Sequence, residues 1–227
     1  MTGPALAHLQ DDLAAAGFLL LGGFRPFPAD GVPDISGGAA AQSLLLIGST
    51  GPSLWHQFVS SPEYRDSLPH PMDRYTKREL SRLSGAHGCE SLFPFEGPPY
   101  FPFQQWALRC GGFSQSPLGV LAHEEYGPWT GFRAAFLSAE TVVGLDASGD
   151  AGPCETCHDK PCLTACPVNA ISAATGYNVP ACKDHLQKDR TISCWSGCLA
   201  RHACPFGAEH TPHPDNARFH MTSFIGM

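Results

Sequence analysis

The chain has 227 residues, which is enough for one sizeable hydrophobic core and a smaller second domain. Its net charge of −7 and its 15% of charged residues exclude a basic footprint for DNA, RNA or an anionic membrane surface, so we expect no nucleic-acid and no membrane partner. The 24 glycines and 21 prolines predict many turns, but a hydrophobic content of 43% is too high for a disordered chain.

The first residues contain no basic stretch ahead of their apolar positions, and they include Asp11 and Asp12, so no signal peptide is expected. The longest apolar runs, at 18–21 and 44–47, are far too short to span a bilayer. We therefore expect a cytoplasmic protein, in which ten cysteines stay reduced rather than forming a disulfide framework.

Hydrophobic periodicity predicts an α/β or α+β domain in the first part of the chain, and an α+β fold for the chain as a whole. The prolines, glycines and aspartates of residues 25–38 predict a loop. The basic side chains in 72–84 predict a solvated helix face. In chain order, the apolar spacings predict helices at 4–16, 53–60, 72–84 and 104–110, and buried strands at 18–22 and 43–48.

Two further apolar runs, 118–122 and 130–137, flank the turn residues 125–128 and predict a β-hairpin. The small residues at 148–153 predict a linker. The expected domains are therefore a front domain, 1–148, and a small cysteine-rich domain, 149–227.

The front domain contains four candidate ligand-binding residues. Tyr100 and Trp106 lie in or beside a proline-rich aromatic stretch, and their faces can stack on a flat macrocycle or flavin; the alternative is that they are core aromatics. His123 and Arg133 face each other across the expected hairpin and can contact an anionic group, unless they are exposed or paired strand residues. No dinucleotide or P-loop glycine motif is present.

The cysteine-rich part is the most informative region of the sequence. Thiolates at such short spacings converge on a metal centre, and a cysteine followed directly by proline indicates iron–sulfur chemistry. Zinc held by four thiolates is the alternative. Cys89 and Cys110 lie outside the group and are expected to be buried free thiols. The eight cysteines of the group are Cys154, Cys157, Cys162, Cys166, Cys182, Cys194, Cys198 and Cys204.

Three histidines, His158, His185 and His202, lie among these cysteines. They are additional candidate ligands. The simpler interpretation is that each is a loop or helix-surface residue.

The segment CETCHDKPCLTACPVNAI resembles the motif of bacterial two-cluster ferredoxins, with the longer second spacing found in ferredoxin-type subunits of molybdenum oxidoreductases. That resemblance implies two 4Fe-4S clusters, with each Cys-Pro cysteine crossing to the other cluster. One cluster would then be bound by Cys154, Cys157, Cys162 and Cys204, and the other by Cys166, Cys182, Cys194 and Cys198.

The order of the two domains resembles that of epoxyqueuosine reductase, where a cobalamin-binding domain of nitroreductase-like fold precedes two 4Fe-4S clusters. Segments near Asp73 and between residues 116 and 137 are also similar to the cobalamin-processing decyanase family. No counterpart of the catalytic-acid region of epoxyqueuosine reductase is found, and the acidic charge does not favour tRNA. The similar positions are Pro71, Asp73, Gly119, Val120, His123, Gly127, Trp129, Phe132 and Arg133.

These resemblances imply a nitroreductase-like front domain followed by a ferredoxin-like iron–sulfur domain. Single electrons would pass through two clusters to a cofactor on the front domain, with a corrinoid expected first and a flavin second, and a redox protein would be the partner. The alternatives are an electron carrier or adaptor without its own reaction, and a structural module held by zinc.

Overall fold

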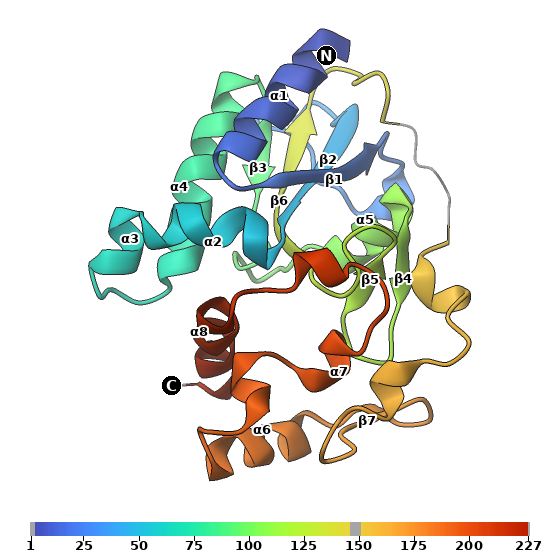
Figure 1. The fold of residues 1–227 in the computed structure, drawn as a ribbon. Coiled ribbons are helices and arrows are strands. Elements are labelled where there is room, and N and C mark those ends of the chain that lie inside the picture. The colour runs from blue at the N-terminus through green and yellow to red at the C-terminus, as the bar shows by residue number, and fades with distance from the viewer. Residues whose placement is uncertain (1–2, 146–150, 227) are drawn as a thin grey trace. The chain divides into compact units, whose positions relative to one another are not determined.

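A computed structural model describes residues 3–145 and 151–226, which form two compact units (Figure 1). The first unit contains 3–49, 53–111 and 131–145, and the second contains 50–52, 112–130 and 151–226. The expected boundary between residues 148 and 149 falls outside the described residues. The division into 1–148 and 149–227 stays a prediction, and the two units interleave along the chain.

The core of the first unit is a four-stranded antiparallel sheet with the order β1-β2-β6-β3. The strands are β1 (Leu19–Phe24), β2 (Ser43–Ser49), β6 (Gly131–Ser138) and β3 (Glu90–Leu92). Every residue of β2 is buried, which explains why this strand is a continuous apolar run rather than an alternating one. The apolar runs at 18–22 and 43–48 thus predicted two strands correctly.

Helices pack onto this sheet. The helices α1 and α4 contact each other and the sheet, and α5 lies against β1 (Figure 1). All four helices expected in the first part of the chain are confirmed, whereas α3, a single turn, was not predicted. The helices are α1 (Gly3–Ala15), α2 (Gly51–Val59), α3 (Pro62–Arg65), α4 (Pro71–Ala86) and α5 (Phe103–Cys110), and the loop 25–38 contains the 3-10 turn η1 (Pro28–Asp30).

The basic face of α4 is paired with acidic groups. Arg78 forms an ion pair with Glu63 at 2.5 Å, and Arg74 forms one with Asp66 at 2.7 Å. These two pairs join α3 to α4. The expected solvated helix surface is therefore also a set of ion pairs.

The second unit has little regular sheet. A short hairpin, β4 with β5, is followed by turns and short helices, and α8 packs against η4 and α6. Among the residues that the structure describes, no helix is long and apolar enough to cross a membrane. The elements are β4 (Phe113–Gln115), β5 (Leu121–His123), η2 (Pro153–Glu155), η3 (Pro161–Leu163), β7 (Ile171–Ser172), β8 (Gly176–Tyr177), α6 (Val179–Lys188), η4 (Ser193–Ser196), α7 (Leu199–His202), η5 (Ala208–His210) and α8 (Pro214–Ile225).

The predicted hairpin between 118–122 and 130–137 is wrong. The strand β5 pairs with β4, and β6 pairs with β2 and β3. The turn residues 125–128 instead close a tight loop in which the backbone of Gly127 bonds back to His123. His123 and Arg133 therefore do not face each other as partners in one hairpin.

Candidate functional site

All eight candidate ligand cysteines lie in the second unit, on short helices and the turns between them. Pro153 and Pro161 begin the 3-10 turns η2 and η3, where a proline fits because the first helical position needs no N–H donor. These turns carry Cys154 and Cys162. Of the other six cysteines, Cys157 lies two residues after η2 and Cys166 three residues after η3. Cys182 lies on α6, Cys194 on η4, Cys198 immediately before α7 and Cys204 two residues after it.

The structure brings the distant Cys204 to the first group of cysteines. Burial raises the pKa of the Cys162 thiol, and negative charge at Cys204, Cys154 and Cys157 raises it further. Burial also raises the pKa of Cys204, as do the negative charges at Cys154 and Cys157, whereas the backbone N–H of Phe206 lowers it. These four thiols are electrostatic neighbours, and we call them the first cysteine set.

The remaining four thiols form a second cysteine set. The pKa of Cys194 is raised by burial, then by negative charge at Cys198, and further by Cys182 and Cys166. Burial raises the pKa of Cys182 as well, and Cys198 and Cys166 add to the effect. Both groupings coincide with the crossed ligand sets that the ferredoxin resemblance implies.

The thiols of each set are neighbours, but they are not arranged around the position of a single metal ion in the described residues. Within residues 3–145 and 151–226, no three His, Cys, Asp or Glu side chains are arranged to hold a single metal ion. The assignment of the eight cysteines as ligands therefore stays a prediction.

Hydrogen-bond donors act on several of the sulfurs. The backbone N–H of Ala170 donates to Cys166 Sγ at 3.3 Å. Burial raises the pKa of the Cys194 and Cys182 thiols, and the backbone N–H of Leu199 and the hydroxyl of Tyr177 act in the opposite direction, on Cys194 and Cys182 respectively. Such donors stabilise thiolates and metal-bound sulfur, so the chemistry of the donor sets fits iron–sulfur clusters.

Apolar side chains pack against all four cysteines of the second set and against Cys162 of the first. Leu118 and Ile171 form a buried cluster with Cys162, and Cys166 and Cys198 pack against it. A second cluster, centred on Leu186, Trp195 and Ile225, has Cys182 and Cys194 packed against it. Cys162 is buried in this packing, whereas the other seven cysteines are half-buried.

The segment Gly112–Thr130, expected to belong to the front domain, contributes directly to the surroundings of the cysteines. The hydroxyl of Ser114 accepts a hydrogen bond from the Cys154 backbone N–H at 3.0 Å. Gly127 has a φ of +55°, and a Cβ built there would lie 2.0 Å from the carbonyl oxygen of Phe206. Only glycine permits this close approach to the chain that follows Cys204.

The three histidines among the cysteines occupy ordinary positions. His158 and His202 are exposed and His185 is half-buried. The His202 ring packs edge-on against Trp129 at 5.2 Å between centroids. None of the three joins a group that could hold a single metal ion within the part of the chain that the structure describes.

Of the four candidate ligand-binding residues, two are enclosed by protein. Trp106 is 1% exposed, packs against Phe101 and Phe103, and donates its indole N–H to the Asp30 carbonyl at 2.8 Å. His123 is 9% exposed. A polar partner and close packing are what a core aromatic residue requires.

The His123 ring supports a turn of the second unit. Its Nδ1 accepts hydrogen bonds from the backbone N–H groups of Glu125 and Tyr126, at 3.1 and 3.3 Å. Burial, together with the charge on His210, lowers the pKa of His123 to about 4. The imidazole is therefore neutral at pH 7 and acts as an acceptor.

The other two candidates are more accessible. Tyr100 is 68% exposed. Arg133 is half-buried, and its Nε donates to Ser49 Oγ at 2.8 Å. Burial lowers the pKa of Arg133 to about 10, although the negative charge of Asp73 acts to raise it. Burial likewise raises the pKa of Asp73, although the positive charge of Arg133 acts to lower it. A weakly solvated guanidinium of this kind is suited to an anionic group.

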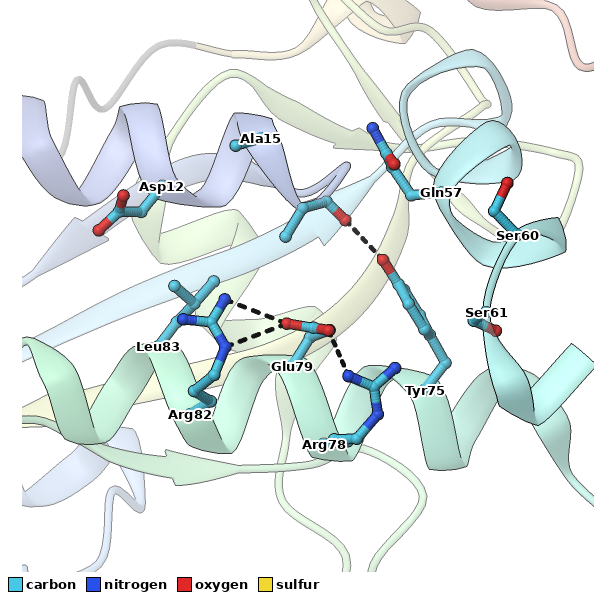
Figure 2. Close-up of a pocket in the computed structure, with 11 residues that line it drawn as sticks. Asp12, Ala15, Gln57, Ser60, Ser61, Tyr75, Arg78, Glu79, Arg82 and Leu83 are labelled. Carbon is cyan, nitrogen blue, oxygen red and sulfur yellow. Dashed lines mark hydrogen bonds and ion pairs between the residues drawn. The ribbon is translucent and has the colours of Figure 1, made fainter.

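The first unit also has a polar depression of about 330 Å³, shown in Figure 2. The hydroxyl of Tyr75 points across it and donates to the Ala16 carbonyl at 3.0 Å. On its lower wall Glu79 pairs with both Arg78 and Arg82. The charges in this depression are thus matched within the protein, and its eleven lining residues do not include the four candidates.

Cys89 and Cys110, the two cysteines outside both sets, are buried, at 7% and 6% exposed. Burial raises the pKa of both thiols, that of Cys110 to about 12. The prediction that they are buried free thiols is confirmed.

The chain resembles curated proteins of electron transfer in parts of its length. No family model matches it. It is 37% identical over 73 residues to YsaA of Escherichia coli K12, which is named as a candidate electron transport protein, and 24% identical over 136 residues to UacF of the same organism, named as a candidate oxidoreductase. These matches cover 32% and 60% of the chain but only 41% of YsaA and 16% of UacF.

The fold has counterparts among solved structures. The B12-trafficking protein CblC of C. elegans, a homologue of human MMACHC, superimposes with a TM-score of 0.58 at 12% identity, over 98% of this chain and 92% of that one. The epoxyqueuosine reductase of Streptococcus thermophilus gives a TM-score of 0.51 at 14% identity, over 90% of this chain and 65% of the reductase. The expected α+β class is confirmed: this is a mixed α+β fold of the kind found in these two proteins.

Proposed function

We propose that this protein is an iron–sulfur redox protein that carries two 4Fe-4S clusters and passes single electrons. The observation that carries the proposal is the grouping of eight thiols, from distant parts of the second unit, into two sets of four. The partial likeness to proteins named for electron transport and oxidoreduction supports it.

Each set has a defined part in the proposal. The first would bind one cluster through Cys154, Cys157, Cys162 and Cys204, and the second would bind the other through Cys166, Cys182, Cys194 and Cys198. A bound 4Fe-4S cluster supplies the ability to gain and lose one electron at a time. The protein would contribute thiolate ligands, a backbone N–H donor to the Cys166 sulfur and apolar packing around the second set, all of which tune the potential of a cluster.

The electron acceptor in this proposal is a cofactor on the front domain, with a corrinoid first and a flavin second. The support is the fold shared with CblC, a protein of B12 trafficking. Arg133, with its weakly solvated guanidinium, and the exposed ring of Tyr100 are the candidates for contact with the ligand. Trp106 and His123 would act indirectly, by supporting the loop and the turn in which they are buried.

The first experiment is the iron, acid-labile sulfide and zinc content of anaerobically purified protein. About eight irons and eight sulfides per chain are expected for two clusters. Stoichiometric zinc without sulfide would replace the proposal by a structural module. About four irons would retain the first set and discard the second.

The second experiment tests the ligand. Cob(III)alamin is added to the reduced, anaerobic protein and its absorbance is followed. A change to the spectrum of a lower cobalt oxidation state supports the corrinoid assignment, whereas unchanged spectra and no binding would remove it.

A second candidate function is that of an electron carrier for a partner redox protein, without a ligand of its own. The stretch of 37% identity to YsaA favours it, because that protein is named for electron transport. Eight irons together with no binding of corrinoid or flavin would select this function.

A further inference from the structure

Cys154 is held by hydrogen bonds to both of its backbone polar groups. Its N–H donates to Ser114 Oγ at 3.0 Å, and its carbonyl oxygen accepts from the ammonium group of Lys160 at 3.0 Å. The serine lies 40 residues before Cys154 in the chain, and the lysine lies 6 residues after it. Two side chains from distant and near parts of the chain thus hold the backbone of one candidate ligand.

The element that contains Cys154 is too short to be rigid by itself. Cys154 is the middle residue of η2, a 3-10 turn of three residues, and such turns have poor hydrogen-bond geometry. The N–H groups in the first turn of a helix have no partner within it, so Ser114 satisfies one such donor. The backbones of Cys194, Cys198 and Cys204 instead bond to residues three or four positions away. The support from side chains therefore distinguishes Cys154 from these three cysteines.

Ser114 has a fixed position in the second unit. It is 3% exposed and is paired with Ala122 in the hairpin of β4 and β5. A Cβ added to Gly152 would lie 2.3 Å from the backbone nitrogen of Ser114, so the chain just before Cys154 also passes close to β4. The hydroxyl of Ser114 therefore relates Cys154 to a rigid hairpin.

Lys160 adopts an uncommon backbone conformation. Its φ of +38° and ψ of +59° lie in the left-handed region, which a residue with a Cβ seldom adopts. The proline that follows, Pro161, also disfavours the right-handed helical conformation at position 160. The bond from Lys160 to the Cys154 carbonyl closes the loop 154–160, which carries Cys157 between its ends.

We propose that Ser114 and Lys160 are positioning residues that hold Cys154 in place for the first cluster, and that they determine how firmly the first cysteine set retains iron. This inference rests on the proposed function, because it requires a bound cluster. Neither residue binds iron; each acts through the backbone of Cys154. A ligand whose backbone is already fixed loses less conformational freedom on binding and resists the displacement by which it would leave the metal.

The test is the rate at which iron is lost to the chelator ferrozine from full-length, anaerobically purified wild-type protein and the Lys160→Met variant. Methionine keeps an unbranched side chain and removes the ammonium group. A hydrogen bond from a charged donor is worth about tenfold or more in an equilibrium. About four of the eight irons should therefore leave about tenfold faster, and the other four at the wild-type rate.

Three further variants make this result specific. Lys160→Arg keeps a charged donor and should restore slow loss. Lys188→Met is the matched control, because it removes an exposed ammonium group on α6 in the same unit, and it should leave both rates unchanged. Ser114→Ala removes the other hydrogen bond to Cys154 and should accelerate the same four irons. These irons are identified with Cys204→Ala, in which adding Lys160→Met should not change the loss of the iron that remains.

The iron content of the wild type separates the two possible failures. A wild-type protein without iron would defeat the proposed function itself. Unchanged loss in Lys160→Met, or equal acceleration of all eight irons, would overturn the inference about Cys154. If Lys160→Met assembles only about four irons, the arginine variant decides: about eight irons in Lys160→Arg support the inference, and about four irons overturn it.

Discussion

The approach of Gly127 to Phe206 allows a sharp test of how the turn after β5 supports the first cysteine set. Replacement of Gly127 by alanine imposes a left-handed conformation on a residue with a Cβ, at a cost of about 1–2 kcal/mol. The new Cβ would also lie 2.0 Å from the Phe206 carbonyl oxygen and 2.7 Å from its carbon, so backbone must move. Overpacking of this kind costs about 1–3 kcal/mol more.

The expected total for Gly127→Ala is therefore about 2–5 kcal/mol in the free energy of unfolding, measured with urea. Gly176→Ala is the matched control, since Gly176 has a φ of +72° in the same unit but has no atom within 4 Å of the position that a Cβ would take. It should lose only the conformational part, about 1–2 kcal/mol.

Iron analysis of the same two variants gives a second measurement. Phe206 lies two residues after Cys204, so a displaced Phe206 should weaken the first set and lower the iron content of Gly127→Ala, whereas Gly176→Ala should keep it. Equal losses of stability in the two variants, or full iron in both, would refute the reasoning.

Three further results are expected. The pKa of His123 is lowered from 6.5 to about 4, so its neutral form stabilises the fold fully above pH 6.5. This contribution is lost as the pH falls toward 4, by about 1.4 kcal/mol at pH 5.5. Urea unfolding of the wild type and of His123→Gln at pH 7.5 and 5.5 measures the loss. The pKa of Glu63 is lowered chiefly by its hydrogen bond with Arg78, so Glu63→Gln should cost roughly 1 kcal/mol at pH 7, less in high salt, and unfolding in low and high salt checks this. Cys204→Ala should retain about four irons and Cys89→Ala about eight; full iron in Cys204→Ala would remove that cysteine from the ligands.

Local sequence signals predicted the elements of the first unit well. The run 43–48 is apolar throughout because β2 is buried along its whole length, and the spacing of apolar residues in 72–84 predicted α4. The hairpin failed for a physical reason. A turn signal at 125–128 says that the chain reverses, but it does not choose the strand with which 130–137 pairs.

The candidate site could be predicted to different extents. The short cysteine spacings indicated a metal centre. The crossed grouping into two sets of four came from the ferredoxin resemblance, because spacing alone does not bring Cys204 to the group around Cys154. The aromatic residues predicted less of the candidate ligand site. The sequence of 94–106 does not distinguish a core tryptophan such as Trp106 from one that lines a pocket. Tyr177 was missed because its packing beside Cys162, Cys166 and Cys198 depends on how β8 folds, which no spacing reveals.

Because the two units interleave along the chain, neither one gene fusion nor one truncation can add or remove a whole unit. A small cysteine-rich unit that follows a larger domain would be expected to form a separate segment at one end of the chain. Here residues 112–130, which belong to the second unit, come before β6 in the chain. The strand β6 belongs to the first unit, where it pairs with β2 and β3. No single cut yields both units whole, so recombination at one junction would leave the transferred module without part of its packing.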